Sequence, residues 1–347
     1  MSYFKKYAKR KSKIKITNIF LLIIIVFLVF EIFQNSTWNR TEGDTKNKDN
    51  EIEDCIEKVS YNIVGISKNN LQDENTKWGS GVIASKKGYI VTNEHIVGNE
   101  NENCSVIFED KKLKGKVVWC DSQIDLAIIK VNYEFEECIK FEESESVKVG
   151  ECVYAIGNPL GNNFKKSVTS GIISGLNRNL EFEENGEKMY LNNLIQTDAT
   201  INSGSSGGAL INKQGELIGI NTIKIFSAES MNFAMPSNII KTIIKKLESD
   251  ENINNIKLGV WIYDKYSIKE SEYNIDLNAG IYVANVDKNS VGEINGIKPG
   301  DIIFSIDGNK VDSILDFKQK LYEESSKKEI ILELKRDKKM YLIKINV

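Results

Sequence analysis

The chain contains a single histidine, His95, together with an aspartate and a serine that could turn it into a catalytic base. Asp125 precedes an apolar run, and Ser206 lies in the glycine-rich segment 204–208, Gly-Ser-Ser-Gly-Gly. Alone, each feature has an ordinary explanation: a surface histidine, a turn aspartate and a flexible loop. A serine nucleophile, however, needs an adjacent base that is itself oriented by an acid. Glycines beside the serine let main-chain N–H groups converge on an oxyanion. The combination predicts a Ser-His-Asp hydrolase.

The order of these residues along the chain separates the folds that carry such a triad. The serine segment also fits the loose G-x-S-x-G pattern of α/β-hydrolases, but those enzymes place the histidine after the serine. Here the histidine comes 111 residues before Ser206. A subtilisin-like order needs an acid before the histidine, and Asp73 lies in a polar stretch. The order His, Asp, Ser is that of chymotrypsin-type double β-barrels.

The segments that must position these residues resemble short strands. Runs of β-branched and apolar residues occur at 81–85, 88–92, 105–108, 115–119, 126–131, 152–157 and 216–221. Many short strands at this spacing favour an all-β barrel or sandwich over alternating strands and helices. The first clear helix pattern comes at 238–247, with Ser237 as its N-cap, and closes a domain near residue 250.

Six segments together resemble the HtrA (Deg) family of serine proteases, from about residue 56 to the C-terminus. They are Gly79–Ile83, Thr92–Ile96, Asp125–Ala127, Ala155–Gly161, Ser170–Ser174 and the Ser206 loop. The resemblance implies an all-β chymotrypsin-like double β-barrel protease domain at 56–250. It makes His95 the general base, Asp125 its orienting acid and Ser206 the nucleophile. The amides of Gly204 and Ser206, with Ser205 between them, would form the oxyanion hole. The proline usual before the family's serine motif is missing here.

The same resemblance places the primary specificity pocket. Its floor lies near Thr200, and its walls are Asn221, Thr222, Ile223, Asn232, Phe233 and Ala234. Because none of these residues is acidic, a preference for Lys or Arg at the cleavage site is disfavoured. Small or medium aliphatic side chains are the expected substrates of this pocket.

A second domain, residues 256–347, has strand patterns at 280–286 and 301–308 and a helix pattern at 315–322. Periodicity alone predicts only a small α+β domain, but Gly296–Ile303 and Ile306–Gly308 resemble the PDZ domains of this family. By that resemblance, Leu258, Gly259 and Val260 bind the carboxylate of a peptide C-terminus, and Phe317 and Leu321 form the other wall of the groove.

The resemblance also suggests a regulatory segment. In relatives, a loop between two motifs, here 170–178 and 194–198, responds to occupancy of the PDZ domain, and Arg178 is the candidate carrier of the signal. The interval 179–191 is acidic and contains a glycine, as expected for a mobile surface loop. A solvated hairpin without regulatory function is the alternative.

The N-terminal segment carries the signs of a membrane anchor. Residues 1–15 hold seven Lys and Arg side chains and no acid, which predicts a cytoplasmic tail. Residues 16–33 are almost entirely apolar and long enough for a transmembrane helix, and residues 34–55 are a polar linker. A cleaved signal peptide is the alternative, although no small-x-small cleavage pattern follows. Both versions place the protease and PDZ domains outside the cytoplasm.

Composition excludes several other classes. A net charge of −3 argues against a nucleic-acid binder. One histidine excludes a multi-histidine metal site, and five cysteines without CxxC spacing argue against a zinc ribbon or a thioredoxin-like site. We expect no cofactor and no metal, and the sequence does not define a disulfide.

The sequence thus predicts a membrane-anchored extracytoplasmic serine endopeptidase of HtrA type, which degrades or processes misfolded envelope proteins under control of its PDZ domain. Unfolded proteins and peptide C-termini are the expected partners. The resemblance adds a homotrimer. The alternative function is a non-proteolytic chaperone or peptide-binding scaffold.

Overall fold

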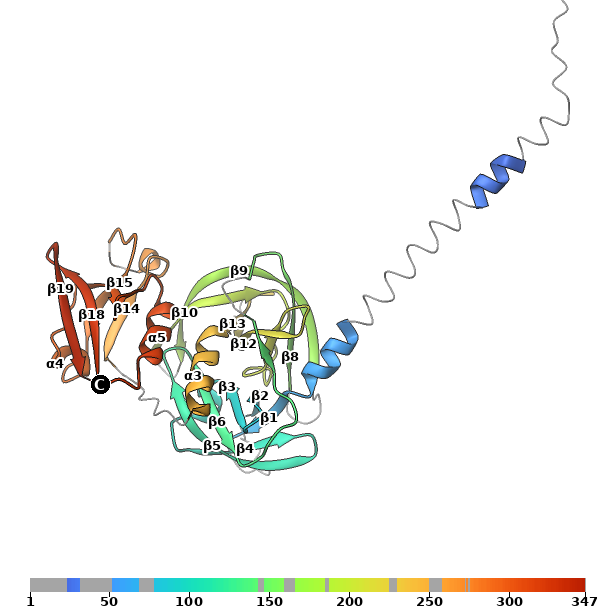
Figure 1. Cartoon of the computed structure of the whole chain (residues 1–347), viewed down its shortest axis with the longest axis horizontal. Coiled ribbons are helices and arrows are strands. Elements are labelled where there is room, and N and C mark those ends of the chain that lie inside the picture. Colours follow the sequence, from blue (N-terminus) through green and yellow to red (C-terminus); the bar gives the residue numbers. More distant parts are fainter. Residues whose placement is uncertain are drawn as a thin grey trace, which may run out of the picture. The chain divides into compact units, whose positions relative to one another are not determined.

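A computed structural model describes residues 24–31, 52–68, 78–142, 147–158, 166–184, 187–224, 230–249, 258–271, 273 and 275–346 (Figure 1). The chain divides into two compact units, Met1–Asp54 and Cys55–Val347. The predicted cytoplasmic tail 1–15 and all but the end of the predicted linker 34–55 lie outside the described residues. A helix covers residues 52–60 at the boundary between the units.

Of the predicted anchor 16–33, the structure describes a helix at residues 24–31, whose side chains are exposed. Within the described part of the chain, no helix is both long enough and apolar enough to cross a bilayer. The anchor therefore stays a prediction.

The second unit begins with a closed β-barrel in the order β1-β2-β3-β6-β5-β4. The strands are β1 (Ile63–Ser67), β2 (Trp78–Ser85), β3 (Tyr89–Thr92), β4 (Asn103–Phe108), β5 (Lys111–Asp121) and β6 (Leu126–Val131). The short helix α2 (Glu94–Val97) follows β3. Val64, Ile83 and Ile129 belong to the buried cluster of this barrel, where β-branched side chains suit strands that bury them.

A second sheet has the order β11-β8-β9-β10-β13-β12-β7, and β11 also pairs with β12, so that six of its strands close a second barrel. The strands are β7 (Lys140–Phe141), β8 (Cys152–Gly157), β9 (Ser167–Glu184), β10 (Glu187–Thr197), β11 (Ala209–Ile211), β12 (Glu216–Lys224) and β13 (Asn232–Pro236). Buried side chains from both barrels share one cluster, including Leu126, Ile220 and Phe233. This common core fixes one barrel against the other.

Helix α3 (Asn238–Glu248) packs Ile239, Ile240 and Ile243 into the shared core. The helix is where the sequence predicts it, but the predicted side-chain cap is wrong. Ser237 has a helical backbone conformation, and its hydroxyl donates to the Leu217 carbonyl at 2.9 Å instead of accepting from the helix. With this backbone conformation the hydroxyl is directed to the Leu217 carbonyl of β12, and no helix N–H donates to it.

The C-terminal domain is a sheet in the order β14-β15-β16-β18-β19, with β17 paired to β16. Its elements are β14 (Val260–Tyr263), η3 (Ile268–Glu270), β15 (Ile281–Val286), α4 (Val291–Ile294), β16 (Ile302–Ile306), β17 (Asn309–Lys310), α5 (Ile314–Glu323), β18 (Glu329–Arg336) and β19 (Lys339–Asn346). Ser313 and Asp316 form a reciprocal capping box at the start of α5. Among the described strands of this sheet, β14 lies at one edge. The predicted double barrel followed by a small α+β domain is confirmed.

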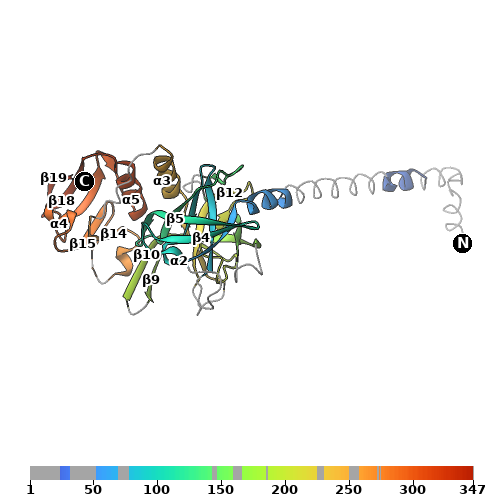
Figure 2. The ribbon, with the colours of Figure 1, turned by 90° about the horizontal axis from the view of Figure 1, so that it is seen from below.

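Helix α5 lies beside α3, as Figures 1 and 2 both show. Different sides of α5 pack into different hydrophobic cores, one in the C-terminal domain and one between the barrels. Phe317 and Leu321 pack into the C-terminal domain. Leu315 and Tyr322 join the cluster shared by the two barrels. Residues three or four apart share one helix face, so a single helix connects the C-terminal domain with the barrels.

The predicted mobile loop at 179–191 is for the most part strand. Strands β9 and β10 pair from Leu180 with Leu191 out to Glu184 with Glu187, in one long hairpin. Residues 185 and 186 lie outside the described part. The extended pairing reflects the alternation Leu-Glu-Phe-Glu, which favours a strand.

Candidate active site

The three candidate catalytic residues come from different elements that meet between the barrels. His95 is in α2, directly after β3, and Asp125 ends the turn between β5 and β6. Ser206 lies in the turn before β11 of the second barrel. Thr222 of β12 links the candidates of the two barrels, because its hydroxyl donates to Asp125 and its carbonyl accepts from the Ser206 hydroxyl.

The Asp125 carboxylate is held by several donors. His95 Nδ1 lies 3.0 Å from Oδ1 and 2.9 Å from Oδ2, and the His95 main-chain N–H also donates to Oδ1, at 3.1 Å. Thr222 Oγ1 donates to Oδ2 at 2.6 Å. A proton on Nδ1, facing the carboxylate, makes Nε2 the ring nitrogen that can accept a proton, which is the tautomer required of a general base.

The turn that carries Asp125 is itself unusual. Asp125 has φ +50, in the left-handed region that few side chains other than Asn and Asp adopt. Its carbonyl accepts a hydrogen bond from Asn93 Nδ2 at 2.9 Å. Asn93 comes two residues before His95, so the same short segment fixes both the imidazole and the backbone of the acid.

The loop around Ser206 is fastened to the first barrel by Ser80. The Ser80 N–H donates to the Ser206 carbonyl at 2.8 Å, and its hydroxyl donates to the Gly204 carbonyl at 2.7 Å. Gly207 has φ +81, and a Cβ there would lie 2.1 Å from the Ser80 carbonyl oxygen. Only glycine fits this approach. The sequence analysis did not select Ser80, although it lies in Gly79–Ile83, one of the segments that carry the family resemblance.

Within the loop, the Ser206 hydroxyl donates to the Thr222 carbonyl at 2.9 Å. The Ser205 N–H donates to the Asn202 carbonyl at 2.8 Å. The Ser205 amide is therefore engaged inside the loop, and its neighbours Gly204 and Ser206 supply the N–H groups on either side of it. Gly204 has φ +90, which lets the chain reverse direction there.

Glu94 is a further acid close to the triad. Burial raises the pKa of its carboxyl above the ordinary value, and the neighbouring Asp125 carboxylate raises it further, against the opposing effect of His95. The sequence analysis did not select Glu94, since its only signal is its place beside the histidine.

The predicted pocket residues lie in several environments. Thr200 is exposed, and its carbonyl accepts from Thr169. Thr222 is buried against the triad, as described above. Asn232 is buried, and its Oδ1 accepts from the Ile201 N–H at 3.2 Å.

The remaining pocket candidates are mostly buried. Asn221 donates to the Ala209 carbonyl at 3.0 Å. Phe233 and Ala234 pack into the clusters of the barrels. The Ile223 side chain lies outside the described part. The pocket assignment stays a prediction.

The predicted peptide-binding residues of the C-terminal domain gather in one place. Leu258, Val260, Phe317 and Leu321 belong to the same buried cluster. Gly259 has φ +63, and a Cβ there would lie 2.4 Å from the Ser290 side chain. Its carbonyl accepts from the Asp287 N–H at 2.8 Å. The loop therefore has a fixed left-handed turn at the start of edge strand β14.

A buried polar contact joins helix α5 to the turn that carries Asp125. Asp121 Oδ2 accepts from Lys318 Nζ at 2.6 Å and from the Tyr322 hydroxyl. Asp121 Oδ1 accepts from the Gln123 N–H at 2.9 Å, within the turn. Burial alone would raise the pKa of Asp121, but Lys318 and the hydrogen bonds outweigh it and hold the pKa below its ordinary value.

This contact was missed because Asp121, Lys318 and Tyr322 are ordinary surface residue types in the sequence. Lys318 and Tyr322 are only 8% and 2% exposed. The Tyr322 ring also packs edge to face on Trp119, with 5.4 Å between ring centroids. The spacing of Leu315, Lys318 and Tyr322 along one helix face was the available signal, but a sequence does not reveal what that face covers.

Arg178 lies within the β9–β10 hairpin. Its Nε donates to Gln196 Oε1 at 3.0 Å, and its guanidinium lies over Gly175, where a Cβ would come within 2.6 Å of it. These contacts keep Arg178 within its own hairpin.

Family models match both domains. A trypsin-like peptidase domain matches residues 79–220, and a PDZ domain matches residues 257–347. The serine protease Do-like HtrB of Bacillus subtilis is 36% identical over 312 residues, covering 82% of this chain and 68% of the relative. An HtrA-like serine protease of Staphylococcus epidermidis is 32% identical over 346 residues, covering 93% of this chain but only 59% of the relative.

Solved structures agree with this assignment. The serine endoprotease of Yersinia pestis is 28% identical, with a TM-score of 0.58, and the match covers 85% of this chain and 96% of that one. The HtrA-type protease AlgW with a tripeptide is 26% identical, with a TM-score of 0.62 and the same coverage of 85% and 96%. The resemblance seen in the sequence is thereby confirmed, and this chain belongs to the HtrA family of serine proteases, as a serine endopeptidase.

Proposed function

We propose that Ser206 is the nucleophile of this endopeptidase, with His95 as its general base and Asp125 as the acid that orients the base. His95 Nε2 takes the proton of the Ser206 hydroxyl as Oγ attacks the peptide carbonyl, and then gives it to the leaving amine. The amides of Gly204 and Ser206 stabilise the oxyanion. Hydrogen bonds from Thr222 and the His95 N–H keep the Asp125 carboxylate aligned. Water then hydrolyses the acyl-enzyme by the same groups.

The observation that carries this proposal is the contact of Asp125 with both His95 Nδ1 and Thr222 Oγ1, 2.9 and 2.6 Å from one carboxylate oxygen. Such a geometry holds Nδ1 of the imidazole against the acid, and Thr222 also links the acid to the serine loop, because its carbonyl accepts from the Ser206 hydroxyl at 2.9 Å. A histidine that served only the fold would not require an acid with so many donors.

Gel zymography on an unfolded protein tests the proposal. Wild type should clear the substrate, and Ser206→Ala should not, while Ser205→Ala, its matched neighbour, keeps most activity. Loss of activity in Ser205→Ala with activity retained in Ser206→Ala would show that Ser205, not Ser206, is the nucleophile. Equal clearing by wild type and Ser206→Ala would reject Ser206 as the nucleophile, and no clearing by wild type would favour a non-proteolytic chaperone or scaffold.

The proposed place of action is outside the cytoplasm, with residues 16–33 as a single-pass anchor and misfolded envelope proteins as substrates. The apolar run and the basic residues before it support this orientation. Full-length protein should stay in membranes through alkaline carbonate washing, and external protease should remove the domains from intact cells. A soluble form that begins after Phe33 as the main species would instead indicate a signal peptide.

The proposed role of the PDZ domain is to capture peptide C-termini and to adjust protease activity. The left-handed turn at Gly259 and the edge strand β14 suit capture of a carboxylate followed by strand addition. A related protease has been solved with a tripeptide. Helix α5 supports the regulatory part, because Phe317 packs into the core of the PDZ domain while Lys318 donates to Asp121. Arg178 remains a second candidate for the signal.

Cleavage of a short chromogenic substrate tests this regulation. A peptide with a free hydrophobic C-terminus should raise turnover in wild type, by about 5–150-fold for a coupling free energy of about 1–3 kcal/mol. Comparing Lys318→Met with Arg178→Ala separates the two routes. Unchanged turnover despite confirmed peptide binding would mean that the PDZ domain only tethers substrates.

Two further parts complete the proposal. The protein forms a homotrimer, which analytical ultracentrifugation tests. Its specificity pocket accepts small aliphatic side chains.

A further inference from the structure

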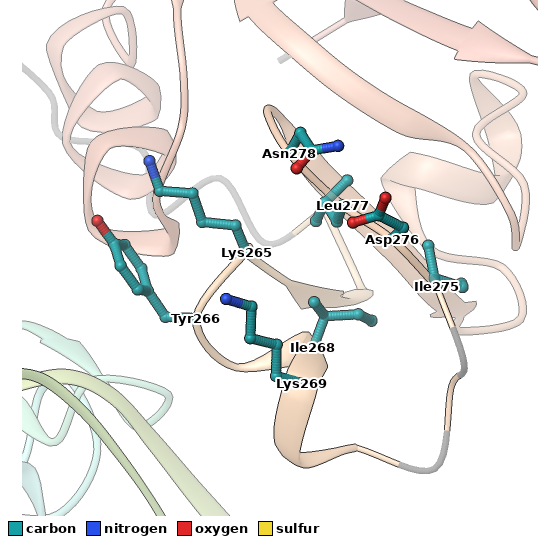
Figure 3. Close-up of a pocket in the computed structure, with 8 residues that line it drawn as sticks. All are labelled: Lys265, Tyr266, Ile268, Lys269, Ile275, Asp276, Leu277 and Asn278. Atoms are coloured by element: carbon teal, nitrogen blue, oxygen red, sulfur yellow. The ribbon is translucent and has the colours of Figure 1, made fainter.

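A pocket of about 340 Å³ lies in the C-terminal domain, beyond the end of β14. It is lined by Lys265, Tyr266, Ile268, Lys269, Ile275, Asp276, Leu277 and Asn278 (Figure 3). Ile268 and Leu277 are buried, whereas Lys269 and Asp276 are exposed. In Figure 3, the lysines and Tyr266 come from the segment after β14, and Ile275–Asn278 form the opposite side. The pocket has an apolar base and, with two lysines against one aspartate, a positive rim.

The segment that carries the lysines is rigidly attached. Asp264, directly after β14, is fully buried. Its Oδ1 accepts from the Tyr266 and Ser267 N–H groups at 3.0 and 2.9 Å. Its Oδ2 accepts from the Ile314 N–H, at the start of α5, at 3.1 Å. One carboxylate thus fixes the turn that bears Lys265 to the end of β14 and to the start of helix α5.

Lys265 and Lys269 take part in no hydrogen bond or ion pair found between described residues, apart from the Lys265 ammonium lying 5.1 Å from the Tyr266 ring centroid. Among the ion pairs between described residues, none joins Asp276, on the other side of the pocket, to either lysine. Two ammonium groups on a fixed turn, above a hydrophobic base, suit an acidic side chain carried by an extended peptide.

The position of this pocket relative to Gly259 decides which part of a peptide could reach it. A peptide that adds to β14 with its carboxylate at Gly259 runs antiparallel to the strand, so its upstream residues pass toward Tyr263 and the turn beyond. Strand residues rise about 3.3 Å each. Lys265 therefore lies opposite a residue about four to six positions upstream of the C-terminus.

We propose that the pocket lined by Lys265 and Lys269 is an upstream specificity subsite, which selects C-terminal peptides with an acidic residue about four to six positions before a hydrophobic end. The inference rests on the proposed capture of peptide C-termini by this PDZ domain and names the substrate class that such capture favours. An unfolded chain with a hydrophobic end and an acidic segment before it is the ligand.

Fluorescence anisotropy with labelled decapeptides on the full protein tests the subsite. One peptide carries Glu at the fourth to sixth positions before a hydrophobic end, a second carries Gln there, and a third is the Glu peptide with an amidated C-terminus. At low salt the Glu peptide should bind about 3- to 10-fold more tightly than the Gln peptide, as expected for two partly exposed ion pairs. The ratio should shrink in high salt.

Two charge-matched double variants complete the test. Lys265→Gln/Lys269→Gln should bring the Glu-to-Gln affinity ratio to about one while leaving the Gln peptide's affinity unchanged, which also reports an intact fold. Lys310→Gln/Lys339→Gln removes the same charge from exposed positions elsewhere on the domain and should keep the ratio. Loss of the ratio in both variants, or in neither, would overturn the subsite.

The peptides also separate this inference from the function on which it rests. Equal binding of the Glu and Gln peptides to wild type, with weak binding of the amidated one, would reject the subsite and leave C-terminal capture standing. Equal binding of the free and amidated Glu peptides would reject C-terminal capture, and the subsite as an upstream position with it.

Discussion

The buried contact between Asp121 and Lys318 should dominate the attachment of the PDZ domain to the barrels. The two side chains are 7% and 10% exposed, with 2.6 Å between Nζ and Oδ2. Asp121→Asn leaves the Lys318 ammonium buried without a counter-charge, and Lys318→Met does the same to the carboxylate. Removing one partner of a buried pair costs about 3–5 kcal/mol. Each single variant should lower the free energy of unfolding by about that amount.

The double variant distinguishes a true pair from two separate effects. With both charges gone, no unpaired charge remains, and replacing a buried pair with apolar or neutral groups is often close to neutral. Asp121→Asn/Lys318→Met should therefore cost much less than the sum of the single changes, so that the two effects are strongly non-additive.

Urea unfolding followed by tryptophan fluorescence and circular dichroism measures these values. Trp119 reports the contact directly, because its ring packs on Tyr322. Lys344→Met is the matched control: its pair with Glu329 is 68% and 43% exposed, so it should cost no more than about 1 kcal/mol. If Asp121→Asn and Lys318→Met cost no more than this control, or if their effects simply add, the contact does not hold the domains together.

Three further outcomes follow from the site. Ser206→Ala and His95→Ala should each reduce kcat on the order of 10⁴-fold, and the double variant should lose little more, since triad members act as a unit; additive losses in single-turnover assays would contradict the triad. Thr222→Val, which removes a donor to Asp125, should lower kcat about tenfold or more with KM nearly unchanged, as a hydrogen bond to a charged group predicts; an effect on KM alone would place Thr222 in the pocket instead. Because the pKa of Asp121 is held below its ordinary value of 3.8, its stabilisation is complete above that value and is lost as the pH falls through the lower folded pKa; urea midpoints should therefore drop more steeply in wild type than in Asp121→Asn/Lys318→Met on going from pH 5 to pH 3.

The sequence predicted the protease fold because its informative residues act locally. The strand runs, the glycines of the Ser206 loop and the order of His95 and Asp125 are all visible in short segments. The capping of α3 was wrong for a tertiary reason, since a carbonyl of β12 captured the Ser237 hydroxyl. The interval 179–191 was expected to be a mobile loop, but its alternating pattern extends β9 and β10 into a hairpin.

The residues that the sequence did not reveal act between distant segments. Ser80 supports the Ser206 loop across 126 positions, and Lys318 reaches Asp121 across 197. Neither has a distinctive local pattern, because a serine between glycines suits any turn and a lysine on a helix suits any surface. Such contacts depend on which faces the fold brings together, and only the structure supplies that.

The Asp121 carboxylate shows how these distant contacts could govern the chemistry. Its Oδ2 accepts a hydrogen bond from Lys318 of helix α5, while its Oδ1 accepts from the Gln123 N–H in the turn that ends at Asp125. A displacement of α5 would break the hydrogen bonds from Lys318 and Tyr322 to Oδ2 and leave the buried carboxylate without its counter-charge. Asp121 would then shift, and its hydrogen bond with the Gln123 N–H would shift with it. Catalysis depends on Asp125 holding the imidazole within hydrogen-bond distance, so small movements of the turn are enough to change turnover. If the PDZ domain regulates the protease as proposed, a small movement of the turn between β5 and β6 is enough to carry the signal.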